Sequence, residues 1–243
     1  SYPSRHPVLP PPGPPLSSQT SALSATSAVS AGAASAKSNP ASSASSASAS
    51  ASISQVKAEQ KQKASEKLDK EIRKLIREAI AASNKKAGKS AKSRTFSMTP
   101  EQKILAANFT ANKGKLPWPV ASGVVKLRFG TNPSPIDPSI KIKSNGVRIA
   151  TNKGEPVRAV FEGVVQGIMT PKNGNNTIMI RHGNYITVYK NLSKFYVSKG
   201  DKVTTKQILG EVITNKASGE SILSFGIYKD SAIQNPSIWV YKL

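Results

Sequence analysis

Hydrophobic positions recur with a helical period from Ser54 to about Asn84. Lysine, glutamate and glutamine fill the positions between them, which is the pattern of an amphipathic helix. Gly88 and the basic run of residues 85–94 end the pattern. The stripe is short, so it fits either a helix packing on its own domain or the end of a longer coiled coil. Its apolar members are Leu68, Ile72, Leu75, Ile76, Ala79 and Ile80.

A second helix is predicted from Thr99 onward. Thr99 is a suitable N-cap, and Pro100 at the first position is followed by an acidic residue, Glu101, in the first turn. Ile104, Leu105 and Phe109 are expected to form its apolar face, with Gly114 ending it. Residues 113–120, KGKLPWPV, then form a rigid lead into the next domain.

After Val120 the pattern changes to short runs typical of strands, separated by turn residues such as Gly174 and Gly183-Asn184. Residues 115–243 are long enough for one all-β domain with its own core. Trp118 and Trp239 are expected to close the two ends of that core. The predicted strands are residues 122–129, 147–151, 157–169, 177–181, 184–190, 207–213 and 221–228.

Residues 1–52 are almost wholly serine, alanine, proline and threonine. Such a segment cannot bury enough apolar surface to offset the entropy of ordering it. The sequence therefore predicts three parts: a disordered tail (1–52), a helical segment (53–114) and an all-β domain (115–243).

Composition limits the chemistry further. The absence of cysteine excludes disulfides, zinc–thiolate sites and thiol nucleophiles. The net charge of +22 is divided equally between residues 1–114 and 115–243, and it favours polyanions without choosing among them. No apolar run approaches the roughly 20 residues that span a bilayer, and no signal-peptide core is visible.

Two stretches of the β domain resemble a known family. Residues 154–165, GEPVRAVFEGVV, resemble the LytM-type (lysostaphin-like) signature G-T-P-V-x-A-x-x-x-G-x-V. Residues 197–203, VSKGDKV, followed by Gln207-Ile208-Leu209-Gly210, resemble its V-x-x-G-D-x-V and G-Q-x-I-G segments. The resemblance covers roughly residues 115–243. It implies a LytM-like fold: a barrel-sandwich hybrid, or duplicated hybrid motif, of antiparallel sheets.

The closest likeness is to the EnvC-like branch, the degenerate LytM proteins that activate murein amidases, in its Bacteroidetes-type form. The KGKLPWPV segment, Phe129-Gly130 and the terminal Asn235-Pro236 and Trp239 carry this likeness. It implies that residues 53–114 are a coiled-coil end and a regulatory helix. It also implies a periplasmic or cell-envelope location.

The zinc motifs of this family are altered here. Active members carry H-x-G-x-D, Y-x-H-L and H-L-H-F, where this chain has SNGVR (144–148), YKNL (189–192) and ILSF (222–225). The three zinc ligands correspond to Ser144, Arg148 and Ser224, and zinc hydrolysis needs about three protein ligands. The two assisting histidines correspond to Asn191 and Ile222.

The resemblance therefore implies a binding protein that is not an enzyme, with no metal, no cofactor and no catalytic residue. His182, the only histidine outside the tail, is expected to be a surface or hairpin residue. The expected partner is a periplasmic murein amidase, with peptidoglycan itself and peripheral envelope association as further possibilities. The predicted partner-binding groove comprises Ser144, Asn145, Arg148, Tyr189, Asn191, Ile222 and Ser224.

Three other functions compete with this one. An active zinc endopeptidase requires the altered motifs to be misaligned, yet no other histidine lies nearby. A biotinyl or lipoyl carrier needs a lysine in an M-K-M or D-K-A context, which Asn215-Lys216-Ala217 does not supply. Nucleic-acid or other polyanion binding rests on charge alone, since aromatic residues are 6% of the chain and no stacking motif is visible. We expect no nucleic-acid partner.

Overall fold

The computed structural model describes residues 43–134, 138–172 and 174–243, with side chains described from Gln55 onward except at positions 57 and 58. Residues 1–42 of the predicted disordered tail lie outside the described residues. The helix α1 (Ser43–Lys86) begins before the predicted boundary at residue 52. In the described residues, no helix is both long and apolar enough to cross a membrane.

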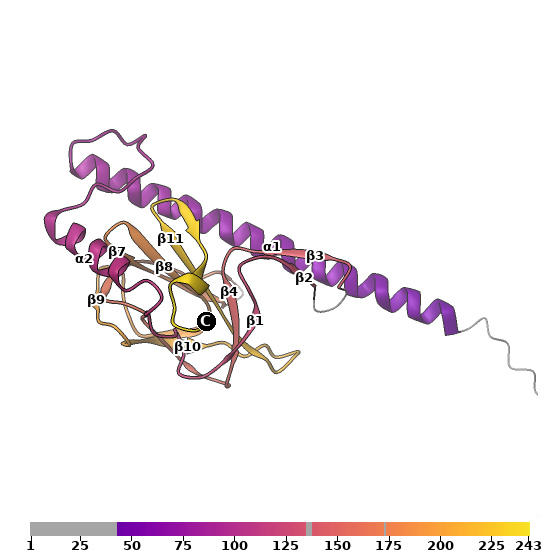
Figure 1. Cartoon of the computed structure of the whole chain (residues 1–243). Coiled ribbons are helices and arrows are strands. Elements are labelled where there is room, and N and C mark those ends of the chain that lie inside the picture. The colour runs from indigo at the N-terminus through magenta and orange to yellow at the C-terminus, as the bar shows by residue number, and fades with distance from the viewer. Residues whose placement is uncertain (1–42, 135–137, 173) are drawn as a thin grey trace, which may run out of the picture. The chain divides into compact units, whose positions relative to one another are not determined.

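Helix α1 packs along the β domain by its predicted apolar stripe (Figure 1). Ile72, Ile76 and Ile80 are fully or almost fully buried. They pack against Ile186 and Val188 of a central strand, together with Met179, Tyr228 and Phe96. A helical stripe with a 3.6-residue period can cover one face of a sheet in this way. The interpretation of an amphipathic helix packing on its own domain is therefore confirmed.

Helix α2 (Pro100–Ala111) begins as predicted. Thr99 caps it, and Gln102 completes the capping box by accepting from the Thr99 backbone. Phe109 is fully buried in the core. Ile104, by contrast, is 62% exposed, so its assignment to the apolar face is wrong. Ala106 takes the buried position instead, because a small side chain lets the helix approach the sheet.

In the described residues, ten strands form one antiparallel sheet and two more pair separately. The main order is β1-β4-β11-β8-β7-β6-β9, while β10 pairs with β5 and β8, and β12 pairs with β11. β2 and β3 form the small sheet. The strands are β1 (Val124–Leu127), β2 (Gly130–Pro133), β3 (Lys141–Ser144), β4 (Val147–Thr151), β5 (Pro156–Arg158), β6 (Gly163–Met169), β7 (Asn176–His182), β8 (Tyr185–Phe195), β9 (Lys202–Val203), β10 (Ile208–Val212), β11 (Ser221–Lys229) and β12 (Ala232–Gln234).

One predicted strand is two strands. The run 157–169 divides because β5 pairs with β10, whereas β6 pairs with β7 and β9. Residues 159–162 cross between these pairings, and Val160 gives its backbone N–H to the Tyr189 hydroxyl at 2.9 Å. The short strands β2, β3, β9 and β12 were not predicted. The all-β fold class expected from the sequence is confirmed.

The two tryptophans lie together at one side of the domain. Leu116 bridges to Val240, and Trp118 Nε1 donates to the Tyr241 carbonyl at 2.8 Å. Trp239 is buried beside Phe109. The expectation that the tryptophans close the two ends of the core is therefore wrong. The chain segments before and after the sheet pair with each other, which brings the backbone beside both tryptophans together.

The β7–β8 turn fixes where α2 sits. Gly183 has φ +70°, and a Cβ at this position would stand 2.4 Å from the Gln102 carbonyl oxygen and 2.6 Å from the Ala106 Cβ. Only glycine satisfies both the backbone conformation and the close approach. This contact sets α2 against the end of β7, where His182 meets Phe109.

Candidate functional site

Three side chains form a row across neighbouring strands. Ser224 of β11 lies opposite Arg148 of β4 on one side and Lys190 of β8 on the other. Alternate residues of a strand face opposite sides of a sheet. The neighbours Phe225 and Tyr189 accordingly face the core, where both are fully buried. The row itself faces α1.

The β3–β4 turn stands at the end of this row. Ser144 is buried, and its hydroxyl donates to the Gly146 carbonyl at 2.8 Å. A Cβ at Gly146 would stand 2.3 Å from the Phe225 carbonyl oxygen, so glycine is needed for the turn to reach β11. The motif glycine thus keeps its packing role, while the serine beside it is committed to a local hydrogen bond.

Asp69 of α1 joins the helix to the row. Its carboxylate, 6% exposed as a residue, accepts from Lys190 Nζ at 2.8 Å and from Asn145 Nδ2 at 2.9 Å. Burial lowers the pKa of the Arg148 guanidinium, and the Asp69 charge opposes that shift. The carboxylate is satisfied by charged and polar groups, as a buried charge requires. Asp69 therefore supplies an acidic group to a basic site.

A hollow of about 560 Å³ lies between α1 and this part of the sheet. The helix contributes Leu68, among others, and the strands contribute the row. Asn191, with φ +71°, turns its amide to the Ile222 carbonyl, to which Nδ2 donates at 3.1 Å. Lining residues from the sheet side include Arg148, Lys190, Asn191, Ile222 and Ser224, and those from α1 include Lys61, Ser65, Leu68 and Glu71.

A known protein family matches the part of the chain that contains this row. Residues 142–236 match the model of peptidase family M23. The match runs from β3 past β12 and so spans the whole row. The chain contains an M23 (LytM-type) domain.

One curated relative and several solved structures resemble the chain. The relative is the peptidoglycan DD-endopeptidase ShyA of Vibrio cholerae, 40% identical over 67 residues. That stretch is 27% of this chain and 16% of the relative, so this chain spans a small part of that protein's length.

Among solved structures, lysostaphin from Staphylococcus simulans is 24% identical, covering 51% of this chain and 52% of its own, with a TM-score of 0.42. Helicobacter pylori Csd3 is 25% identical over 53% of this chain and 35% of its own, with a TM-score of 0.43. A chain of the SpoIIQ–SpoIIIAH pore-forming complex is 23% identical over 54% of this chain and 93% of its own, with a TM-score of 0.45.

The seven predicted groove residues divide into three groups. Arg148, Asn191, Ile222 and Ser224 line the hollow. Ser144 and Asn145 lie in the adjoining turn, where Asn145 contacts Asp69. Tyr189 is fully buried and does not line the hollow; burial raises the pKa of its phenol to about 12.

His182 lies in a hairpin, as expected, but the expectation of a surface position is wrong. It ends β7 in the β7–β8 hairpin, as expected, but it is fully buried and stacked on Phe109. Nδ1 donates to the Glu162 carbonyl at 2.5 Å, so Nε2 of the neutral ring accepts from the Thr187 hydroxyl at 2.9 Å. Burial lowers its pKa to about 4. The imidazole is a structural part of the core.

The donor set of the M23 domain does not fit zinc. A guanidinium keeps its positive charge and offers no lone pair, so Arg148 opposes a divalent cation. The Ser144 hydroxyl is bonded to Gly146, and Ser224 lies between two cationic side chains. Within residues 43–134, 138–172 and 174–243, no three His, Asp or Glu residues are placed to hold a metal ion.

Sequence reasoning missed two residues of the site, Lys190 and Asp69. Lys190 occupies the variable position of the Y-x-H-L motif, and only the strand register shows that it faces Ser224. Asp69 lies three residues before Ile72, on the buried side of the predicted helix. An acidic residue in an apolar stripe was the available signal, because a buried carboxylate needs a cationic partner.

Proposed function

We propose that this chain is a non-catalytic cell-envelope regulator that binds and activates a peptidoglycan (murein) amidase, aiding cell-wall remodelling or daughter-cell separation. The observation that carries the proposal is the row at the M23 site. Its framework is intact at Gly146, Tyr189 and Phe225, which still pack the core and the turn. The positions that bind zinc in active members instead present Arg148 and two hydroxyls.

The cell wall as the setting is supported by the family match and by the relative that is named a peptidoglycan DD-endopeptidase. A periplasmic or envelope location follows from this setting and belongs to the same proposal. Binding of peptidoglycan itself is compatible with it.

The amidase segment would bind in the hollow beside the row. Arg148 and Lys190 make this surface cationic. The Asp69 carboxylate pairs with Lys190 and acts electrostatically on Arg148, so a carboxylate is the group that this surface binds within the chain itself. An acidic residue on the amidase could form charge-assisted hydrogen bonds of the same kind. We infer that α1 acts as a regulatory helix, since an amidase carboxylate and Asp69 would compete for one set of partners. The coiled-coil end expected within residues 53–114 belongs to the same proposal.

The test is dye release from labelled peptidoglycan by the cognate amidase, with the protein carrying Arg148→Glu and Asn191→Trp. These changes reverse one charge and fill the hollow. They should cost roughly 2–5 kcal/mol of binding, as expected when a buried charged partner is lost. The expected result is loss of stimulation at protein concentrations where the unaltered chain is fully effective. The carboxylate introduced in place of Arg148 would also repel Asp69, so the loss could not come from a tighter α1.

The matched control is Lys199→Glu with Thr205→Trp. Both positions are exposed and neither lines the hollow. The control therefore makes the same change in charge and a similar change in side-chain bulk, but away from the proposed contact. This control should stimulate as the unaltered chain does. Undiminished stimulation by the folded Arg148/Asn191 variant would rule out the hollow as the amidase contact.

A further inference from the structure

A second hollow, of about 440 Å³, lies at the C-terminal end of α1, where the helix meets the start of α2 and strands β6 and β7. Its lining is mainly apolar, with Ala79, Ala82 and Met98 on the helix and connecting-segment sides. Its polar groups include Arg181, Gln166 and Lys86. None of these residues lines the hollow at the M23 row.

Arg181 brings a cation with spare hydrogen-bonding capacity to this hollow. Its Nε donates to the Gly183 carbonyl at 2.7 Å, which fixes the side chain. Its Nη2 makes only long contacts, 3.4 Å to the Ser97 carbonyl and 3.5 Å to Gln102 Oε1. Bonds of this length are near the limit of useful geometry. The guanidinium also stacks over Phe96, 4.0 Å from the ring centre.

The nearest acidic influence on Arg181 is already engaged. Asp230 affects the guanidinium electrostatically, but its two oxygens accept from the Phe96 backbone N–H and from Asn184 Nδ2. In the described part of the chain, no carboxylate lies within 4.0 Å of the Arg181 nitrogens. Burial lowers the pKa of Arg181 to about 10, so it remains charged at neutral pH.

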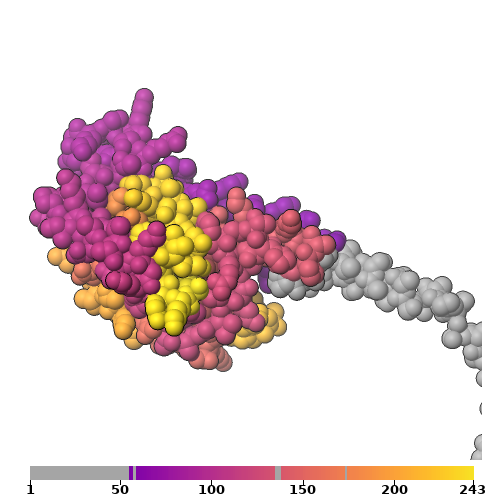
Figure 2. Space-filling model, viewed as in Figure 1, coloured from indigo at the N-terminus to yellow at the C-terminus, as the bar shows by residue number. Residues whose placement is uncertain are grey.

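A basic segment borders the hollow. Residues 85–95 are exposed throughout and carry five cations, with no acidic residue between Glu78 and Glu101. The segment is held at its base, because the Asn84 side chain bonds to Thr95 and Ser97. Figure 2 shows this part of the surface projecting beyond the end of α1. The cations are Lys85, Lys86, Lys89, Lys92 and Arg94.

We propose that this hollow binds a carboxylate side chain on an acidic segment of a partner protein. The planar guanidinium fork of Arg181 matches a carboxylate, while the alanines and Met98 accommodate its methylene groups. The exposed cations beside it would steer an acidic segment toward the hollow. A flat anionic membrane would meet the projecting lysines but could not reach Arg181.

The acidic residue that follows the basic segment in the sequence does not occupy this hollow: Glu101 is exposed in the first turn of α2 and does not line it. The inference does not rest on amidase activation.

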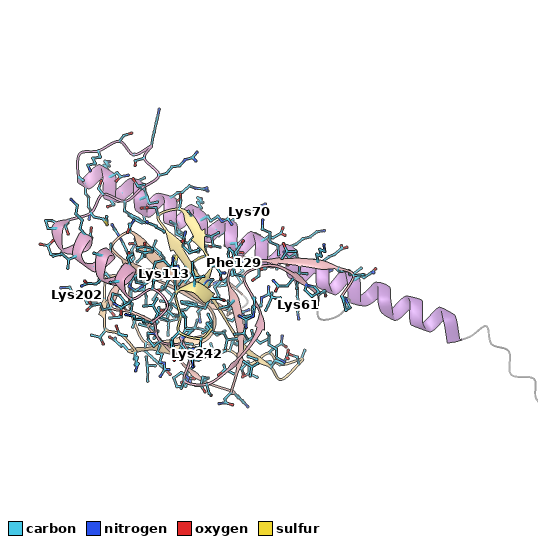
Figure 3. The ribbon with its side chains drawn as sticks, viewed as in Figure 1. Lys61, Lys70, Lys113, Phe129, Lys202 and Lys242 are labelled. Carbon is cyan, nitrogen blue, oxygen red and sulfur yellow. The ribbon has the colours of Figure 1, made fainter. Side chains whose placement is uncertain are left out.

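The probe is a fluorescein-labelled peptide of sequence EELEELEE, with QQLQQLQQ as its neutral counterpart, followed by anisotropy. Three forms of the full chain are compared with the unaltered one. Lys89→Glu, Lys92→Glu and Arg94→Glu together reverse the exposed rim. Lys126→Glu, Lys199→Glu and Lys202→Glu make the same charge change on exposed positions elsewhere. Lys202 is the first residue of β9 and lies away from the basic segment (Figure 3). Arg181→Lys keeps the charge but removes the fork.

The acidic peptide should bind at least roughly tenfold more tightly than the neutral one. The rim variant should weaken binding roughly tenfold, and the variant altered elsewhere by less than about twofold, since distant exposed charges are screened. Arg181→Lys should weaken binding roughly fivefold because bidentate contact is lost.

Equal effects of the two charge-reversed forms would overturn the proposal and assign binding to overall charge. The alternative outcome is that the unaltered chain binds vesicles of phosphatidylglycerol and phosphatidylcholine but not the acidic peptide. If only the rim variant then loses vesicle binding, the segment is a membrane-binding one instead. The rim residues are exposed, so their variant tests the proposal even if Arg181→Lys does not fold.

Discussion

His182 is a neutral ring held at both nitrogens inside an aromatic cluster. Phe109 stacks on it with ring centres 4.9 Å apart, and Phe161 meets it edge-on. Thr187 also lies 3.3 Å from the Tyr189 hydroxyl, which links the imidazole to the residue that anchors Val160. Among the described residues no carboxylate pairs with His182, so a proton added to this ring would be an unpaired buried charge. The residue therefore makes the fold sensitive to acid.

Acid should destabilise the protein through His182. Its folded pKa of about 4 lies below the ordinary value of 6.5, so the unfolded chain binds more protons between these limits. The stabilisation is complete above pH 6.5 and is lost as the pH falls toward 4. The loss is about 3 kcal/mol in all. Urea unfolding at several pH values in this range measures it.

The control is His182→Gln, which removes the titrating group. Its free energy of unfolding is expected to be lower at neutral pH but to fall less steeply with acid. Parallel pH profiles for the two proteins would show that another group is responsible.

Helix α1 combines two kinds of contact with the M23 domain. Ile72, Ile76 and Ile80 bury apolar surface against β8 and its neighbours. One turn earlier, Asp69 holds Lys190 and Asn145 at the row. Burial of apolar groups is not directional, whereas the Asp69 bonds require one position of the helix. The ionic contact thus determines how α1 covers the hollow.

Replacing Asp69 by Ala should loosen this part of α1. Lys190 would lose its buried ion-pair partner and Asn145 its acceptor, and removing one partner of a buried ion pair costs roughly 3–5 kcal/mol. We expect faster amide hydrogen exchange at residues 62–72 and unchanged exchange in β7 and β8. In the dye-release assay, half-maximal stimulation of the amidase should then need a lower concentration of the Asp69→Ala variant than of the unaltered chain.

Lys74→Ala is the control for this change. Lys74 pairs with Glu78 at 3.9 Å on the exposed side of the same helix, where such pairs contribute little. Unchanged exchange in α1 of the Asp69 variant would show that the isoleucines alone hold the helix.

The sequence predicted those elements whose signal is local. The cap at Thr99 and the periodic isoleucines of α1 need only neighbouring residues, and both predictions are confirmed. The exposure of Ile104 and the division of residues 157–169 depend on pairing with distant segments. The contact between Asp69 and Lys190 joins positions 121 residues apart, which no local pattern encodes. The altered motif positions did predict four residues that line the hollow, Arg148, Asn191, Ile222 and Ser224. They could be predicted because each motif fixes which residues of neighbouring strands lie opposite one another.

At the scale of the molecule, the M23 site and the helix that precedes it form one unit. The row on β4, β11 and β8 lies within the residues that match family M23, and its side chains are two cations and a hydroxyl. α1 provides the Asp69 carboxylate, which pairs with Lys190 and acts on Arg148 electrostatically. This combination supports the proposal of a protein that binds an acidic partner, because a guanidinium and hydroxyls are poor ligands for a zinc ion that activates water.

The most direct test of this account is dye release from labelled peptidoglycan by the purified protein alone, measured with zinc added. A zinc-binding M23 enzyme would release dye in proportion to time and protein, and a chelator would abolish the release. We predict no release above the blank at any zinc concentration, with release appearing only when the amidase is present. Zinc-dependent release by the protein alone, absent from a folded Ser144→Ala, Ser224→Ala variant, would contradict this proposal.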